Sequence, residues 1–165
     1  MKSGDLIRVT TFVGVDPVTA FEVFMRETDL WWRGGPRYRF GGARRGTLRF
    51  EPGSDGRLFE QFDAPEAEIF EVGKVLVWEP GARLVFEWRI RNFAPGERTE
   101  VEVRFEPAEG GTRVTLEHRG WDTLPKDHPV RRGLDGSAFA TLMGLWWGEL
   151  LTTMRAHIAS SSTRR

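Results

Sequence analysis

The alternation of apolar and charged residues between Gly73 and Trp121 constrains the fold of this chain more than any other feature. The pattern reads Lys-Val-Leu-Val-Trp-Glu from Lys74, Arg-Leu-Val-Phe-Glu-Trp from Arg83, Glu-Val-Glu-Val-Arg-Phe from Glu100 and Thr-Arg-Val-Thr-Leu-Glu-His from Thr112. A period of two is typical of strands that have one face in a core and the other in water. Successive strands of this kind form an antiparallel meander, and its apolar face must be covered by another layer.

The rest of the chain supplies further strands and two short helices. Asp16-Pro17 predicts a helix start, because aspartate caps free amides and proline suits the first helical position. A second short helix is expected at 29–32, and the glycine- and arginine-rich segment 33–46 is expected to be a loop. The expected strands are 7–15, 47–51, 57–63, 66–78, 83–91, 99–106 and 112–119.

A long C-terminal helix provides the cover that the sheet needs. It is expected to begin at Pro129 or Ser137 and to end near His157. Its apolar residues follow helical spacing at Phe139, Met143, Trp146, Leu150 and Met154, whereas Thr141, Gly144, Gly148, Thr152 and Arg155 occupy the opposite side. Strands segregated from helices indicate an α+β fold, here a curved antiparallel sheet of about seven strands around one long helix. Residues 1–159 are expected to form a single domain, with 160–165 as a frayed tail.

The last hairpin has a predictable register. If Gly110-Gly111 forms a two-residue turn, Glu102 lies opposite Arg119 and Val103 lies opposite His118. This register places His118 as the one polar side chain in an inner-facing apolar stripe.

Composition excludes several functional classes. Lysine and arginine together number 24, as do aspartate and glutamate, so a general polyanion binder is not expected and no nucleic-acid partner is predicted. The chain has no cysteine, which removes disulfides, thiolate zinc sites and cysteine nucleophiles. No apolar run is long enough for a membrane span, and no secretory signal is recognisable, so a soluble cytoplasmic protein is expected. Neither a metal site nor a cofactor is predicted, and the chain is expected to be a monomer or a homodimer.

Four segments resemble the family of homologues of the activator of heat-shock protein 90 ATPase. They are 21–33, 73–88, 99–107 and 111–121, and the last ends in Leu-Glu-His-Arg-Gly-Trp. The resemblance implies the START-like helix-grip fold of the SRPBCC superfamily, which agrees with the order of elements derived from the residues. It also implies a hydrophobic cavity between sheet and C-terminal helix. Some members of this superfamily catalyse cyclisations or dehydrations, and the family name suggests a chaperone-associated or stress-response role.

Three functions therefore stay open: ligand binding in a cavity, an enzyme of the cyclase or dehydratase type, and a protein-interaction module with a filled core. Cavity volume separates them, because a ligand pocket holds at least about 300 Å³. The residues expected to bind ligand are Trp32, Phe86, Trp88, Val103, His118, Phe139, Met143 and Trp146, and the alternative for each is a packed core. For His118 that alternative is a structural histidine bonded to its neighbours.

Two further groups of residues have both a functional and a structural interpretation. Trp31, Trp32 and Arg33, with the segment 37–39, could frame a pocket mouth in which arginine holds a carboxylate. They could equally be core tryptophans beside a solvated loop. No hydrolase elbow or phosphate loop is present, so an enzyme would rely on His118 or on a carboxylate such as Glu60 or Glu71.

Overall fold

One antiparallel sheet organises the computed structural model, which describes residues 6–63 and 68–163. Within those residues the sheet has seven strands in the order β1-β7-β6-β5-β4-β3-β2. Their bounds are β1 Ile7–Val13, β2 Gly46–Phe50, β3 Arg57–Phe62, β4 Ile69–Glu79, β5 Arg83–Trp88, β6 Thr99–Ala108 and β7 Gly111–Arg119. The three strands expected within 83–119 are confirmed, although β5 ends three residues earlier than predicted. The predicted start of the preceding strand, at residue 66, lies outside the described residues.

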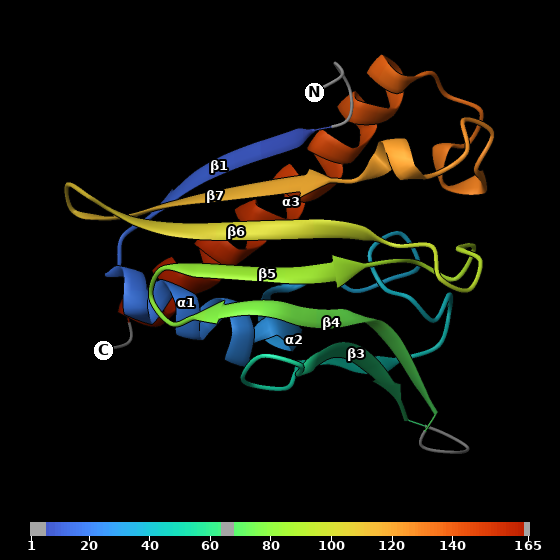
Figure 1. Cartoon of the computed structure of the whole chain (residues 1–165). Coiled ribbons are helices and arrows are strands. Elements are labelled where there is room, and N and C mark those ends of the chain that lie inside the picture. The colour runs from blue at the N-terminus through green and yellow to red at the C-terminus, as the bar shows by residue number, and fades with distance from the viewer. Residues whose placement is uncertain (1–5, 64–67, 164–165) are drawn as a thin grey trace.

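The helices lie on one face of this sheet. They are α1 Pro17–Arg26, α2 Thr28–Trp31 and α3 Gly136–Thr163, with short 3₁₀ turns η1 Trp121–Thr123 and η2 Pro129–Arg131. Figure 1 shows α3 running behind the strands, across the full width of the meander. The α+β helix-grip prediction is confirmed. Of the two predicted starts of the long helix, Ser137 is confirmed to within one residue, because α3 begins at Gly136, whereas Pro129 begins the separate turn η2. The predicted end of the helix near His157 is too early: α3 continues to Thr163, since its last residues include no glycine or proline that would end it.

The predicted register of the last hairpin is wrong by two residues. Ala108 pairs with Gly111, so Glu109 and Gly110 form the turn, and His118 lies opposite Val101. Gly110 has a φ of +80°, whereas a Cβ on Gly111 would meet the Val13 carbonyl oxygen at 2.0 Å. The two glycines therefore serve different needs: one permits the turn and the other permits close approach of β1. A slip of two residues keeps every side chain on its predicted face.

The sheet curves around the helix because β4 is irregular. Its register shifts opposite β3, between Leu58 and Phe59, and again opposite β5, between Val75 and Val77. Such bulges bend a strand and increase its local twist. As a result β2, β3 and the first half of β4 curl toward the helices (Figure 1).

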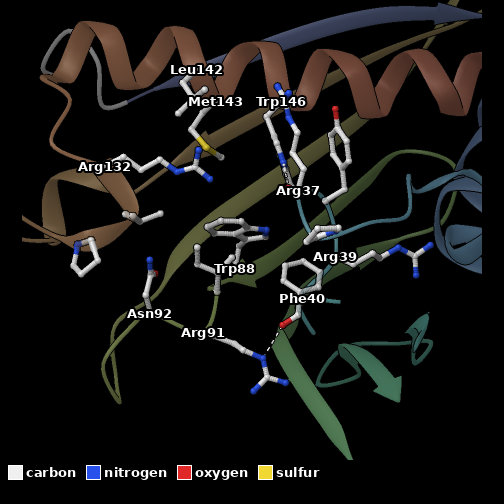
Figure 2. Close-up of a pocket in the computed structure, with 16 residues that line it drawn as sticks. Arg37, Arg39, Phe40, Trp88, Arg91, Asn92, Arg132, Leu142, Met143 and Trp146 are labelled. Carbon is white, nitrogen blue, oxygen red and sulfur yellow. Dashed lines mark hydrogen bonds between the residues drawn. The ribbon is translucent and has the colours of Figure 1, made fainter. Parts of the chain in front are cut away.

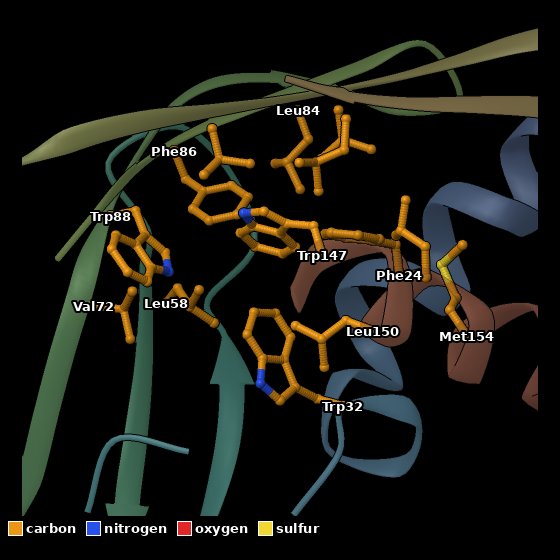
Figure 3. Packing of buried hydrophobic residues seen from close by; sticks show 14 of the residues in the cluster. Phe24, Trp32, Leu58, Val72, Leu84, Phe86, Trp88, Trp147, Leu150 and Met154 are labelled. Atoms are coloured by element: carbon orange, nitrogen blue, oxygen red, sulfur yellow. The ribbon is translucent and has the colours of Figure 1, made fainter. Parts of the chain in front are cut away.

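The apolar stripes of the sheet and of α3 meet in one core, as predicted. Leu84, Phe86 and Trp88 of β5 lie on the inner face, as do the buried apolar residues of β6 and β7. On α3 the buried stripe runs through Phe139, Met143, Trp147, Leu150, Leu151, Met154 and Ile158. Figure 3 shows Trp147 and Leu150 among the inner side chains of β5 and β3. In the part of the chain that the structure describes, no helix is long and apolar enough to cross a membrane.

Candidate functional site

A cavity of about 500 Å³ lies between the end of β5 and the first half of α3. Trp88 and Ile90 form one side, Leu142, Met143 and Trp146 of α3 form the other, and two loops close the ends (Figure 2). The loop residues are Pro36, Arg37, Tyr38, Arg39, Phe40 and Gly42 from the first loop, and Arg91, Asn92, Pro129, Val130 and Arg132 from the chain after β5 and around η2. Arg37, Asn92 and Arg132 are exposed, so the cavity reaches the surface.

The first loop is fastened to α3 through aromatic and charged contacts. Trp146 donates its indole N–H to the Arg37 carbonyl oxygen at 2.9 Å and stacks on Tyr38. Glu149 accepts hydrogen bonds from the Tyr38 hydroxyl and from Arg37 and Arg33. The bond from Tyr38 and the two guanidinium charges hold the pKa of Glu149 below its usual value. The cavity wall is thus built on a loop whose position is fixed by the helix.

The second loop is fastened by its own hydrogen bonds. His128 accepts at Nδ1 from the Val130 amide at 3.1 Å and contacts Glu97 through Nε2 at 2.8 Å. Arg131 donates to the Trp121 carbonyl oxygen at 2.7 Å. Arg132, the next residue, has a φ of +52°, in a left-handed region that non-glycine residues seldom adopt. These contacts hold the backbone that carries Val130 and Arg132 into the wall.

The charged residues on the wall are all arginines. Arg39 is held by Asp29 at 2.6 Å, and Arg37 pairs with Glu149. Arg91 donates from Nε to the Phe40 carbonyl oxygen at 2.7 Å and lies over the ring of Phe70. The backbone N–H of Arg132 donates to the Pro129 carbonyl oxygen at 3.1 Å, but its guanidinium has no hydrogen bond or ion pair with any described residue. The wall itself contains no carboxylate and no histidine among the described residues.

Trp88 contributes a second polar feature to the wall. Its side chain is 2 % exposed, and its buried Nε1 has no hydrogen-bond partner among the described residues. A buried donor without an acceptor is unfavourable by about 1–3 kcal/mol. Any acceptor atom that reached this N–H would remove that penalty.

Three of the eight predicted site residues line the cavity: Trp88, Met143 and Trp146. The other five, Trp32, Phe86, Val103, His118 and Phe139, are at most 2 % exposed and lie in the core instead of on the wall. The predicted pocket mouth divides in the same way. Residues 37–39 line the cavity, whereas Trp31 and Trp32 are core tryptophans.

His118 is enclosed by partners that leave no bond for a ligand. Trp147 donates its indole N–H to Nδ1 at 3.0 Å, so the proton of the neutral ring must be on Nε2. That N–H faces Thr99 Oγ1 at 2.6 Å, and Thr99 donates its own proton to the Trp88 carbonyl oxygen. Burial lowers the pKa of His118 well below 6.5. The histidine is therefore neutral and fully hydrogen-bonded inside the core.

The two carboxylates named as candidate acids or bases do not reach the cavity. Glu60 is 0 % exposed on the inner face of β3, where Oε1 accepts from the Phe40 amide at 2.8 Å. Burial raises its pKa, against the effect of that amide and of Arg39 at 3.8 Å. Glu71 lies next to Phe70 on β4 and pairs with Arg57 at 3.9 Å. In the part of the chain that the structure describes, no group of three or more His, Asp or Glu side chains could hold a metal ion.

Several wall residues carry no sequence signal that would identify them. Asn92 follows the end of a strand, and Arg132 belongs to the irregular stretch between two predicted helix starts. Ile90 does carry a signal, because it continues the period-two pattern of Leu84, Phe86 and Trp88 in the predicted strand 83–91. Leu142 directly precedes Met143 on α3, so the helical spacing of the apolar stripe indicates that it lies beside that stripe. The positions of the others depend on how two loops close over the end of β5.

Comparisons with known proteins agree with the fold and the family suggested by the sequence. Residues 16–154 match the family model described as activator of Hsp90 ATPase homolog 1-like protein. The protein NE0264 from Nitrosomonas europaea has a similar structure, with a TM-score of 0.64, 13% identity and 100% of each chain covered. MLL2253 from Mesorhizobium loti is similar with a TM-score of 0.63 and 16% identity, over 94% of this chain and 97% of that chain. No curated protein matches the chain.

A third similar structure is DynU16, a protein described as belonging to the dynemicin biosynthetic locus. Its TM-score is 0.62 and its identity 18%, and the match covers 95% of this chain and 48% of that chain. At these identities the three structures support the shared fold.

Proposed function

The chain belongs to the family of activator of Hsp90 ATPase homolog 1-like proteins, and we propose that it binds a small hydrophobic or amphipathic ligand between its sheet and α3. The observation that carries this proposal is the cavity of about 500 Å³ at that place. Ligand pockets commonly measure about 300–1,000 Å³ and combine apolar walls with a few polar groups. Here Trp88, Met143 and Trp146 supply apolar surface, and arginines supply the polar rim.

The other two functions are supported less well by the same geometry. A module that works through its surface alone is expected to have a filled core, whereas this protein has a cavity of about 500 Å³. An acid–base enzyme needs a titratable group within reach of its substrate, and Glu60, Glu71 and His118 are not on the wall. We therefore restrict the proposal to binding and do not extend it to catalysis.

A matched pair of substitutions on α3 tests the proposal. Leu142 lines the cavity, whereas Leu145 is 61 % exposed on the same helix and does not line it. Titration with the neutral fluorescent probe N-phenyl-1-naphthylamine should show saturable binding to the unmodified protein and to Leu145→Trp. Leu142→Trp, which fills the cavity with an indole ring, should weaken binding at least about tenfold.

Equal probe binding by the two variants would place the ligand elsewhere and overturn the proposal, as would a complete lack of binding by the unmodified protein. Native mass spectrometry of the purified protein complements the titration. A co-purified small molecule that Leu142→Trp loses and Leu145→Trp retains would identify the chemical class of the natural ligand.

A further inference from the structure

We propose that the ligand is an anion, with an apolar body in the cavity and its negative group at Arg132. This inference rests on the proposed binding function and adds the charge of the ligand to it. The first step is the charge of the wall. Four arginines line the cavity, and no carboxylate does so among the described residues, although the whole chain has a formal net charge of zero. The positive charge is therefore local to this site.

The second step is that the four arginines are not equivalent. Arg39 is committed to Asp29, Arg37 to Glu149 and Arg91 to the Phe40 carbonyl oxygen. The guanidinium of Arg132 has five N–H donors, and none has a hydrogen-bonding or ionic partner among the described residues. A planar fork of this kind is suited to a carboxylate or another oxyanion.

The third step is the direction of this side chain. Figure 2 shows Arg132 extending from the loop after η2 into the cavity, toward Met143 of α3. Asn92, whose amide can also donate to an anion, faces the same space from the chain after β5. The adjacent Arg131 turns away and bonds to carbonyl oxygens of the loop. Two neighbouring arginines thus have different roles, one structural and one facing the cavity.

The backbone provides a further, independent observation. Arg132 is held at a φ of +52°, where a Cβ-bearing residue is strained, and its neighbour Gly133 has a φ of +73°. Strained residues persist where the surroundings over-determine them, and they cluster at binding sites. The bonds of His128 and Arg131 over-determine this turn. These bonds fix the backbone from which the Arg132 side chain extends toward the cavity, which is preorganisation of the site for binding.

Two fluorescent probes with the same aromatic skeleton separate charge from apolar contact. 8-Anilino-1-naphthalenesulfonate carries a negative group, whereas N-phenyl-1-naphthylamine is neutral. The unmodified protein should bind the anionic probe more tightly. Arg132→Gln should weaken binding of the anionic probe by up to about fivefold, as expected for one solvent-exposed charged contact, and leave binding of the neutral probe unchanged. Decanoate should displace the neutral probe better than decanol does, and Arg132→Gln should remove that difference.

Arg155→Gln is the control for net charge. Arg155 is exposed on α3, beyond the residues that line the cavity, and its loss should leave both affinities unchanged. If both probes bind equally well and Arg132→Gln changes neither, the anionic ligand is ruled out while the binding function stands. If neither probe binds the unmodified protein, the proposed function itself fails. If Arg132→Gln and Arg155→Gln weaken binding of the anionic probe equally, the effect comes from the net charge of the protein, and the inference is also overturned.

Discussion

Two polar sites on the inner side of the sheet are built in opposite ways. His118 is 0 % exposed, and each of its ring nitrogens has a partner within the core. Arg132 is exposed, has a left-handed backbone conformation, and its guanidinium has no partner among the described residues. A polar residue on an apolar face is thus a weak indicator of a ligand site. The stronger indicator is a polar group whose bonds are left unmade beside a cavity, and substitutions at His118 and Arg132 test this distinction.

The largest effect is expected from His118→Ala. The substitution removes a buried ring and leaves the donor of Trp147 without an acceptor, so the free energy of unfolding should fall by about 3 kcal/mol or more. Urea denaturation measures this loss. Binding of the neutral probe should be retained under conditions in which the variant stays folded. A stable His118→Ala protein with much weaker binding would show that His118 contacts ligand after all.

Acid should destabilise the sheet without acting on the guanidinium of Arg132. Burial raises the pKa of Glu102, but hydrogen bonds from Arg83, Arg104 and Arg119 outweigh it and lower the pKa to about 2. The native state therefore binds fewer protons than the unfolded chain below pH 4.5. The free energy of unfolding should fall by up to about 3 kcal/mol between pH 4.5 and pH 2 because of this group. Urea denaturation across this range measures the loss.

Glu102→Gln serves as the control for that titration. It should lower stability at pH 7, where the charged contacts are lost, and flatten the profile between pH 4.5 and pH 2. A profile as steep as that of the unmodified protein would assign the acid sensitivity to other groups.

Arg132→Gly should separate stability from ligand binding. Glycine relieves the left-handed backbone, which offsets its greater freedom in the unfolded chain, so stability should stay equal or rise by up to about 1 kcal/mol. Affinity for the anionic probe should fall by up to about fivefold. Asp55→Gly is the matched control, because Asp55 also has a positive φ of 67° but lies in the turn before β3. A loss of anionic affinity in both variants would contradict the role given to Arg132.

The smallest effect concerns the outer face of α3. A Cβ at Gly144 or Gly148 would meet nothing within 4 Å, so no described segment packs there. Gly144→Ala and Gly148→Ala should each stabilise the protein by about 1 kcal/mol through helix propensity, and neither should change probe binding. Thermal unfolding measures the gain. A loss of stability or of oligomeric state would indicate that a second molecule packs closely on these glycines.

Much of the fold could be predicted because the sequence encodes it locally. Period-two alternation marks β5, β6 and β7, and helical spacing marks α3, so the architecture follows from which faces must be buried. The hairpin register was wrong because two adjacent glycines give the same turn signal for different reasons. The cross-strand charges did not resolve it either, since Glu102 reaches Arg119 at 2.7 Å in the observed register as well.

The candidate site was predicted less completely because it depends on contacts between distant segments. Trp88, Met143 and Trp146 were identified from their inward faces, but an inward face does not distinguish a wall from a packed core. His118 has a hydrogen-bond donor at Nδ1 only because of Trp147, which is 29 residues away in the sequence and lies in the helical layer. The position of Arg132 depends on the conformation of a loop, for which the sequence offers no periodic pattern.

The indole N–H signals of the tryptophans provide the most direct measurement of the central claim, that ligand enters the cavity and not the core around His118. The chain has seven tryptophans, and their signals in a ¹⁵N-correlated NMR spectrum can be assigned with Trp→Phe variants. Saturation with N-phenyl-1-naphthylamine should shift the signals of Trp88 and Trp146, which line the cavity. The signal of Trp147, whose indole is hydrogen-bonded to His118, should stay unchanged. Unchanged signals of Trp88 and Trp146, or a larger shift at Trp147, would contradict the account.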